Sequence, residues 1–328
     1  MLEQKNNLFE KALYNTKQIN NIQNAKRTQG QYFTQYNPFE NDGFLEWAEE
    51  CNLKNQTILE PFAGANNLIC MLKKMELCND FVSYDIEPNN VDVLYRNTLI
   101  DFPKNYNVCI TNPPYLAQNS ATRRGLFYPR TKYDDLYKYA LELCLKNCSN
   151  VAAIIPASFL NANIFRNRLS HYILLNAKMF DDTDCPVCLA LFNKKSDDVK
   201  IYDKHYIGLL SELEKKIPEG KDIEMKFNSP TGNLGLIAID NTIEPSIKFI
   251  EGDKISASRV SVSSRSITRI KIDCSLTQLV NKLNEKLMQF RKETNDIFLT
   301  PFKGLRKDNK YRRRLDYALA RKLISEVV

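Results

Sequence analysis

The segment Thr111-Asn112-Pro113-Pro114-Tyr115 carries residue types suited to chemistry on a planar amine. Two consecutive prolines fix two φ angles and remove two N–H groups, so the loop is stiff and its carbonyls remain able to accept hydrogen bonds. Asn112 adds a side-chain amide oxygen, and Tyr115 adds a flat face for stacking. The pattern predicts a site for a planar substrate that bears an amino group. The alternative is a Pro-Pro turn that only closes a loop.

A second loop follows the apolar stretch 57–62 and contains Gly64. Asp85 comes 21 residues after this glycine, and an acidic residue at about this distance holds ribose hydroxyls in Rossmann-type sites. Asp101 and Phe102 add an acceptor and an aromatic ring that suit an adenine. Because the chain lacks a Walker lysine motif and a complete Gly-x-Gly-x-x-Gly, we predict a compact adenosine ligand rather than a dinucleotide or a triphosphate.

These loops require a sheet that brings several strand ends together. Buried strands are predicted at residues 57–62, 81–84, 106–111, 151–155, 174–180 and 187–192. Helices are predicted at residues 44–50, 68–72, 91–97, 134–147 and 160–169. This alternation predicts an α/β fold with a mostly parallel sheet and helices on both faces. Ligands bind such sheets at the carboxyl ends of the strands, which is where the two loops lie.

Length and charge divide the chain into two parts. Its 328 residues suggest about two domains, and the polar run at 194–198 marks a boundary. We predict a catalytic domain over residues 1–195, with an N-terminal extension at 1–29, and a smaller mixed α+β domain over 196–328. Residues 1–200 contain 22 basic and 22 acidic residues, whereas 201–328 contain 24 and 17. The basic second part predicts a polyanion-binding module, and a solvated basic surface is the alternative.

Within the second domain, strands are predicted at 247–249 and 266–272. A helix is predicted through residue 290 with Ser275 as its N-cap, and a final helix at 315–327, opened by the basic residues 312–314.

Membrane and metal partners are not expected. No segment contains the run of about twenty apolar residues that a spanning helix needs, and the N-terminus lacks the basic-then-apolar pattern of a secretory signal. We therefore expect a cytoplasmic protein. The nine cysteines are expected to be reduced thiols. The one C-x-x-C pair, Cys185 to Cys188, does not make a zinc site with the two histidines, His171 and His205.

Residues 28–195 resemble the γ-ordered DNA adenine-N6 methyltransferases of type II restriction–modification systems, because several motifs occur in that family's order. The motifs are 30–34 (GQYFT), 60–64 (EPFAG), 84–88 (YDIEP), 101–102 (DF), 112–115 (NPPY), 135–137 (DLY) and 155–160 (IPASFL). Two positions depart from the pattern, since Asn66 replaces a second glycine and Gln35 replaces a proline. The resemblance implies S-adenosyl-L-methionine as cofactor. Its implied contacts are Thr34, Glu60, Ala63, Gly64, Asp85, Ile86, Asp101, Phe102 and Asn112.

The resemblance also implies transfer of a methyl group to N6 of an adenine that has been extruded from duplex DNA. The implied catalytic residues are Asn112, Pro113, Pro114 and Tyr115, with the Asn112 side-chain oxygen and the Pro113 carbonyl accepting the two amino protons. Tyr115 and Phe180 would stack against the base. The implied fold is a Rossmann-like methyltransferase fold with an antiparallel last strand.

Double-stranded DNA is the implied partner, and a separately acting restriction endonuclease is a second one. The predicted DNA contacts are Arg123, Arg124, Arg259, Arg265, Arg269, Arg312, Arg313 and Arg314. A loose likeness favours a short palindrome such as CATG as the target. The alternatives are an RNA or protein-glutamine methyltransferase with the same NPPY loop, and a nucleic-acid-binding protein without activity. Cytosine-N4 methylation usually accompanies serine in place of Asn112.

Overall fold

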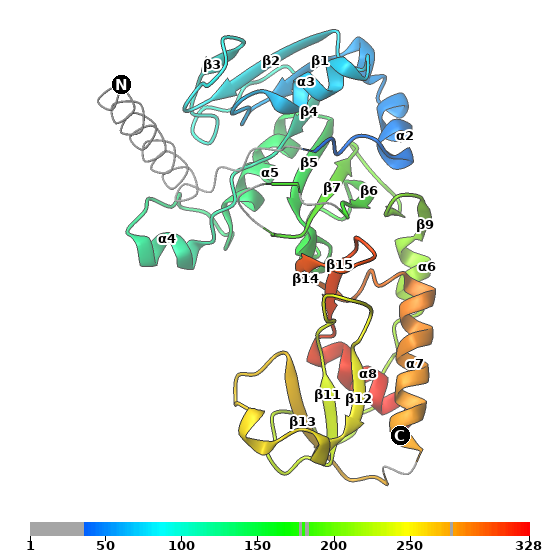
Figure 1. Cartoon of the computed structure of the whole chain (residues 1–328). Coiled ribbons are helices and arrows are strands. Elements are labelled where there is room, and N and C mark those ends of the chain that lie inside the picture. The colour runs from blue at the N-terminus through cyan, green and yellow to red at the C-terminus, as the bar shows by residue number, and fades with distance from the viewer. Residues whose placement is uncertain (1–35, 177–178, 181–183, 276–277) are drawn as a thin grey trace, which may run out of the picture.

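A nine-stranded sheet forms the centre of the protein (Figure 1). The computed structural model describes residues 36–176, 179–180, 184–275 and 278–328. In spatial order the strands are β3 (Val93–Tyr95), β2 (Asp80–Asp85), β1 (Thr57–Glu60), β4 (Val108–Thr111), β5 (Asn150–Pro156), β7 (Val187–Phe192), β6 (Leu169–Leu174), β8 (Lys200–Tyr202) and β9 (Tyr206–Leu209). Strands β1 to β5 are parallel, and β7 is antiparallel to both of its neighbours. This arrangement confirms the predicted Rossmann-like α/β class, including the antiparallel late strand.

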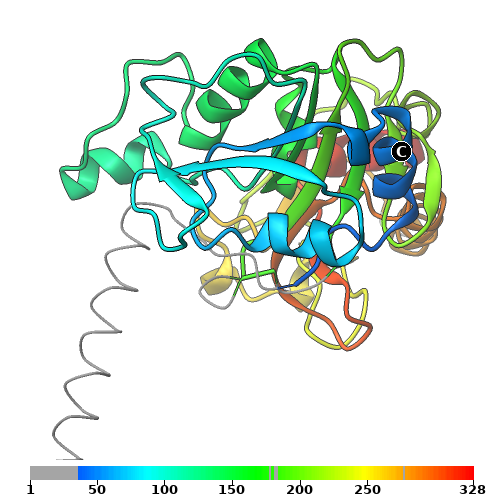
Figure 2. The same ribbon diagram turned by 90° about the horizontal axis from the view of Figure 1, so that it is seen from above.

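Helices cover both faces of this sheet because its strand residues alternate between two apolar cores. Leu59, Cys109 and Ala153 face the core that contains α5 (Leu136–Asn147). Their sequence neighbours Ile58 and Ile110 face the opposite core, which contains α2 (Asp42–Glu50) and α3 (Asn67–Lys74). Figure 2 shows α3 and α5 on opposite sides of the sheet.

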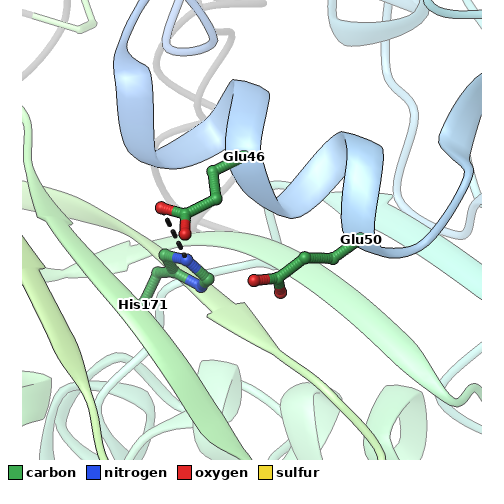
Figure 3. Close-up of side chains that lie close together, drawn as sticks. All are labelled: Glu46, Glu50 and His171. Carbon is green, nitrogen blue, oxygen red and sulfur yellow. Dashed lines mark ion pairs between the residues drawn. The ribbon is translucent and has the colours of Figure 1, made fainter.

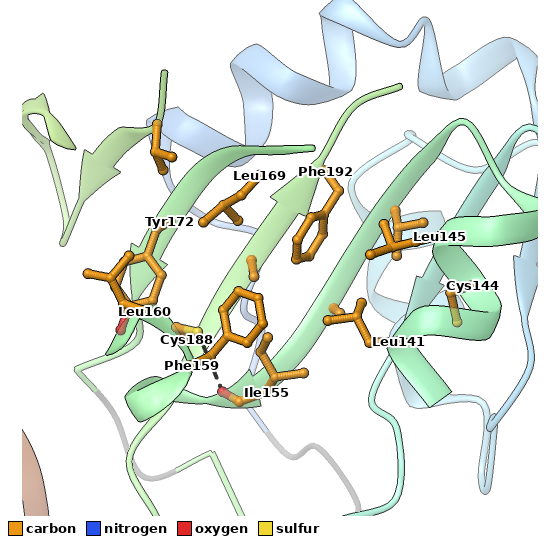
Figure 4. Packing of buried hydrophobic residues seen from close by; sticks show 14 of the residues in the cluster. Leu141, Cys144, Leu145, Ile155, Phe159, Leu160, Leu169, Tyr172, Cys188 and Phe192 are labelled. Atoms are coloured by element: carbon orange, nitrogen blue, oxygen red, sulfur yellow. Dashed lines mark hydrogen bonds between the residues drawn. The ribbon is translucent and has the colours of Figure 1, made fainter. Parts of the chain in front are cut away.

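The core under α5 is built from large, fully buried side chains (Figure 4). Leu141, Cys144 and Leu145 of α5 pack against the sheet, where Phe159 meets Phe192 edge to face with ring centroids 5.9 Å apart. Burial of each such side chain contributes roughly 1.5–3 kcal/mol. This packing holds β4 and β5 rigidly, and the Asn112 loop follows β4 directly.

Shorter helices precede, connect and follow the strands of the large sheet. They are the α-helices α4 (Gln118–Arg124) and α6 (Leu210–Glu214), and the 3₁₀ helices η1 (Leu53–Asn55) and η2 (Ala157–Ala162). Among the described residues, no helix is both long and apolar enough to cross a membrane.

The C-terminal unit has a core of its own. An antiparallel sheet contains β10 (Met225–Lys226), β13 (Ile267–Ile272), β11 (Leu234–Ile237) and β12 (Lys248–Glu251) in that order, with η3 (Gly252–Lys254) and η4 (Ala257–Arg259) in its connections. Helices α7 (Leu279–Thr294) and α8 (Tyr317–Val327) pack on this sheet through one apolar cluster. A hairpin of β14 (Thr300–Leu305) and β15 (Tyr311–Arg314) lies between this unit and the large sheet (Figure 1). The unit is mixed α+β, as predicted.

The large sheet extends past the boundary predicted at residues 195 and 196. Strand β8 pairs in parallel with β6, and β9 pairs with β8. The polar run that suggested a boundary is only a surface turn between two strands of the same sheet. The first unit therefore continues at least through β9, and Leu210 and Leu213 of α6 are buried in its core as well.

Four predicted elements differ in the structure. Residues 91–97 contain the edge strand β3 rather than a helix, and most of the apolar side chains that suggested a buried helix face are exposed there, Val91 at 97%, while Val93 is buried. The helix predicted at 160–169 stops as η2, because Asn163 and Phe165 have positive φ angles of 50° and 56°. The strand predicted at 174–180 lies earlier, as β6. Helix α7 has Gln278, not Ser275, at its N-cap.

Candidate active site

A cavity of about 760 Å³ lies at the carboxyl ends of β1, β2 and β4, where the sequence predicts the ligand. Six of the predicted cofactor contacts line it, together with Pro114 of the predicted catalytic loop. The six are Glu60, Ala63, Gly64, Asp85, Ile86 and Asn112. Thr34, the remaining contact from the N-terminal motif, lies outside the described residues. Three separate sequence motifs therefore meet at one site.

The loop after β1 is held by the carboxylate that ends β2. The Gly64 N–H donates to Asp85 Oδ2 at 2.7 Å, and the Glu87 N–H donates to Asp85 Oδ1 at 2.8 Å. Asn66 occupies the position of the missing second glycine with φ of 64°, a left-handed conformation that asparagine tolerates. Its side-chain oxygen accepts from the Ser83 hydroxyl at 2.8 Å. Asn66 can therefore adopt the backbone conformation of the loop although the family pattern has a glycine at this position.

Asp85→Ala is expected to weaken S-adenosylmethionine binding about tenfold or more, because a charge-assisted hydrogen bond contributes roughly 1.5–3 kcal/mol. Isothermal titration calorimetry measures the change. Asp92→Ala is the matched control, since that exposed carboxylate follows on the same connection and does not line the cavity. Equal affinity in the two variants would place the ribose contact elsewhere.

Glu60 presents an unsatisfied buried carboxyl oxygen to the cavity. The residue is 1% exposed, and Oε1 accepts from the Thr111 hydroxyl at 2.7 Å and from the Phe62 N–H at 3.3 Å. Oε2 is buried and has no hydrogen-bond partner among the described residues. Burial raises the pKa of Glu60 to about 8. A ligand with a cationic nitrogen would supply the missing partner.

The adenine-edge assignment of Asp101 and Phe102 is not supported by their positions. Asp101 points to solvent and forms an ion pair with Arg96 at 2.7 Å, while Phe102 is buried in the core under α5. Neither lines the cavity. Residues 97–100 line the cavity instead. Among them, Asn97 carries a buried side-chain oxygen without a hydrogen-bond partner in the described chain. Asn97 was not predicted as a site residue, because no local motif in the sequence distinguishes it from a surface asparagine.

The catalytic-loop residues lie at the inner end of the cavity. Asn112 and Pro114 line it, whereas Pro113 is buried behind them. The Tyr115 hydroxyl lies 2.7 Å from Asn112 Oδ1 and 2.6 Å from the Ile154 carbonyl. A hydroxyl has one proton and can donate to only one of these oxygens at a time. Burial raises the pKa of Tyr115 well above its usual value, so this proton is retained.

Tyr115 and Phe180 lie together, as the family resemblance implies, but they are in direct contact. Their ring centroids are 6.1 Å apart at an interplanar angle of 75°, and Tyr137 packs on Tyr115 at 6.1 Å and 84°. Phe180 is 1% exposed, and neither aromatic lines the cavity. A base could therefore stack on Tyr115 only after these rings separate.

The predicted DNA contacts differ in how exposed their side chains are. Arg123 and Arg124 are exposed in the last turn of α4, and Arg259 and Arg265 are exposed on the C-terminal unit. Arg269 and Arg312 are partly buried and donate to the backbone carbonyls of Gly232 and Asp240. Arg314 is also partly buried.

Arg313 is 3% exposed, so its prediction as a surface DNA contact is wrong. Arg312, Arg313 and Arg314 lie in strand β15 rather than at the start of the last helix. Alternate residues of a strand face opposite sides, which turns the middle arginine inward.

One cluster of metal-ligand type occurs in the described part of the chain, away from the cavity (Figure 3). Glu46 and Glu50, one turn apart on α2, point toward the buried His171 of β6. The Lys200 ammonium already lies among them, 2.5 Å from Glu46 and 3.3 Å from Glu50. The cluster therefore has its own cation, and it ties α2 to β8.

No protein-family model and no curated protein matches the chain. Among solved structures, a proposed class I S-adenosylmethionine-dependent methyltransferase from Listeria monocytogenes is similar at 15% identity, with 50% of this chain and 63% of that chain covered and a TM-score of 0.36. The type I restriction–modification methyltransferase subunit from Streptococcus thermophilus is similar at 16% identity, with 59% and 50% covered and a TM-score of 0.37. The chain thus spans less than two thirds of the length of either protein.

Proposed function

We propose that this protein is an S-adenosylmethionine-dependent DNA methyltransferase that modifies N6 of adenine. The observation that carries the proposal is the convergence of Glu60, Asp85 and Asn112 on one cavity. The first two suit the two ends of the cofactor, and the third suits an amino group. A companion restriction endonuclease that acts on the same site belongs to the same proposal.

The cavity fits the cofactor at both polar ends. Glu60 would give up its proton when a cation approaches, and Oε2 would then accept from the amino group of the methionine part, while the Asp85 carboxylate accepts from ribose hydroxyls. The Asn97 side-chain oxygen suits the exocyclic amine of the cofactor's adenine, the role predicted from the sequence for Asp101. S-adenosylmethionine would supply an electrophilic methyl group on a sulfonium.

Asn112 would act on the target amine. The lone pair of an adenine amino group is delocalised into the ring, which makes the nitrogen a weak nucleophile. Hydrogen bonds from its two N–H groups to Asn112 Oδ1 and to the Pro113 carbonyl would concentrate electron density on the nitrogen. The two prolines keep these acceptors in place before the substrate arrives, so little reorganisation accompanies the reaction.

The target base must leave the duplex, since its amino group is not accessible to a methyl donor inside the stack. Separation of Phe180 from Tyr115 would open a face on which the base stacks, contributing about 1–3 kcal/mol. The Tyr115 hydroxyl keeps its ring anchored through the Ile154 carbonyl during this movement.

Methylation assays with matched substrates test this proposal. The protein is incubated with methyl-labelled S-adenosylmethionine and with genomic duplex DNA, total RNA or a Gly-Gly-Gln peptide. Label in N6-methyladenine of DNA, located by single-molecule sequencing, is the expected result. Label only in RNA or in glutamine would instead establish one of the two alternative methyltransferase functions. Cofactor binding without any transfer would support the non-catalytic alternative.

Arg123 and Arg124 are expected to contact DNA phosphates, because they are exposed on the helix that follows the catalytic loop. Replacing both with glutamine should lower the slope of log affinity against log salt by about 0.9 for each phosphate that is no longer neutralised. Fluorescence anisotropy over a salt series measures this slope. Lys194 and Lys195 form a matched control pair. They follow Phe192, which pairs with the start of β5, so they lie at the end of the strands opposite to the candidate active site. Equal slopes in the two double variants would contradict the prediction.

A further inference from the structure

A second cavity, of about 870 Å³, lies between the large sheet and the C-terminal unit. It is separate from the candidate active site, and no residue lines both cavities. The large sheet contributes residues that follow β6 and β8. Polar residues of its wall include Asn176 and Asp203 from the sheet side, and Arg291, Asp296, Arg306 and Arg313 from the C-terminal unit.

Two of the three arginines in its wall have carboxylate partners. Arg291 donates to both oxygens of the buried Asp240 at 2.9 Å and to both oxygens of Asp296 at 2.8 Å. Arg306 donates to Asp240 at 2.9 Å and to Asp308 at 2.8 Å. Arg291 and Arg306 are therefore each held by two carboxylates.

Arg313 is buried to a similar extent but has no such partner. It is 3% exposed, and among the described residues its guanidinium makes one hydrogen bond, to the Leu299 carbonyl at 3.5 Å. A guanidinium has five N–H donors and keeps its charge. Burial lowers the pKa of Arg313, in contrast to the raised pKa of Arg291. Most of its N–H donors therefore have no hydrogen-bond partner among the described residues of the cavity wall, and buried donors without partners are costly.

Asn176 supplies a complementary group on the other wall. Its side-chain oxygen is buried and has no hydrogen-bond partner among the described residues. The cavity thus combines strong donors on Arg313 with an acceptor on Asn176 that lacks a donor. The sheet side also contributes the Asp203 carboxylate, which already has the Asn295 side chain at 3.0 Å and the Lys310 ammonium at 3.3 Å as partners.

We propose that this cavity binds a small oxyanion of the phosphate class. Phosphate oxygens would accept from Arg313, and a protonated phosphate oxygen would donate to Asn176. The bound ion would contact both the large sheet and the C-terminal unit, so it would stabilise the packing of these two parts against each other. A DNA phosphate does not suit the site, because Arg313 is buried between two packed units rather than on an open surface.

Titration of the full chain with inorganic phosphate tests this inference. Calorimetry at constant ionic strength, with chloride as the reference salt, should show saturable binding at one site. Arg313→Met should weaken it about tenfold or more, since it removes the guanidinium and keeps an unbranched side chain. Arg314→Met removes the same charge from the next residue of the strand, outside the cavity, and should bind as the unaltered chain does.

Asn176→Asp provides a second variant that does not depend on removing a large side chain. Its carboxylate would supply Arg313 with an internal counter-ion, so phosphate binding should be lost while the melting temperature without phosphate rises. Circular dichroism verifies the fold of each variant. Absence of saturable binding to the unaltered chain, unchanged binding in both cavity variants, or displacement of phosphate by a short DNA duplex would overturn the proposal.

Discussion

Asn112→Ala is expected to reduce methyl transfer by a factor of about 10² to 10³ or more, the range measured when one preorganised hydrogen-bonding group is removed from a site of developing charge. Binding of S-adenosylmethionine should remain close to that of the unaltered protein, because the groups assigned to its two ends are Glu60 and Asp85. Single-turnover kinetics with a saturating DNA substrate measures the chemical step directly. Calorimetry measures the cofactor affinity.

Asn55→Ala is the control for Asn112, since Asn55 is an exposed asparagine at the other end of β1. It should retain full activity. Asn112→Asp is informative as well, because it keeps an acceptor oxygen in the same place. Partial activity in this variant, together with none in Asn112→Ala, would identify the acceptor oxygen as the essential feature. A native-like rate in Asn112→Ala would contradict the proposed mechanism.

Glu60→Gln is expected to stabilise the protein without ligand and to weaken cofactor binding strongly. The folded pKa of about 8 lies above the ordinary value of 4.5, so the folded state holds a proton that the unfolded state has released between these pH values. The free energy of unfolding therefore falls as the pH rises through this window, and the decrease is complete above about pH 8. Each pKa unit corresponds to about 1.4 kcal/mol.

Denaturant unfolding of both proteins at several pH values measures this effect. The glutamine variant should match the unaltered chain near pH 4.5 and exceed it increasingly up to pH 8. Calorimetry with S-adenosylmethionine should show the reverse order of affinities, because the variant lacks the anionic oxygen. A variant that is no more stable at pH 9 would show that the Glu60 proton is not held by burial. Glu87→Gln, an exposed residue of the cavity rim, serves as the control.

Local signals in the sequence predicted the part of the site that lies directly after buried strands. The ends of β1, β2 and β4 are marked by apolar runs followed by a breaker or an acidic residue, and Gly64, Asp85 and Asn112 meet as those signals require. The prediction for Asp101 failed because its neighbour Arg96 binds it, and this pairing depends on how the chain bends between them. A motif match cannot specify such a bend.

The basic residues at 312–314 show a different limit. Counting charge over this segment predicted a basic surface, but a strand alternates its side chains between two environments. Arg313 faces inward, whereas the arginines on either side remain partly exposed. Net charge describes a segment as a whole, and the periodicity of its backbone decides which of its charges a partner can reach.

The continuation of the large sheet through β8 and β9 determines where the chain can be divided. All six residues of β6 are buried, and its outer edge pairs with β8. A fragment that ends at residue 195 would leave that edge as an unpaired row of N–H and C=O groups beside an apolar face, which is the usual template for aggregation. A fragment that ends after Leu209 keeps the edge covered. Isolation of the half of this protein that contains the candidate active site in soluble form therefore depends on fourteen residues that carry none of its predicted chemistry.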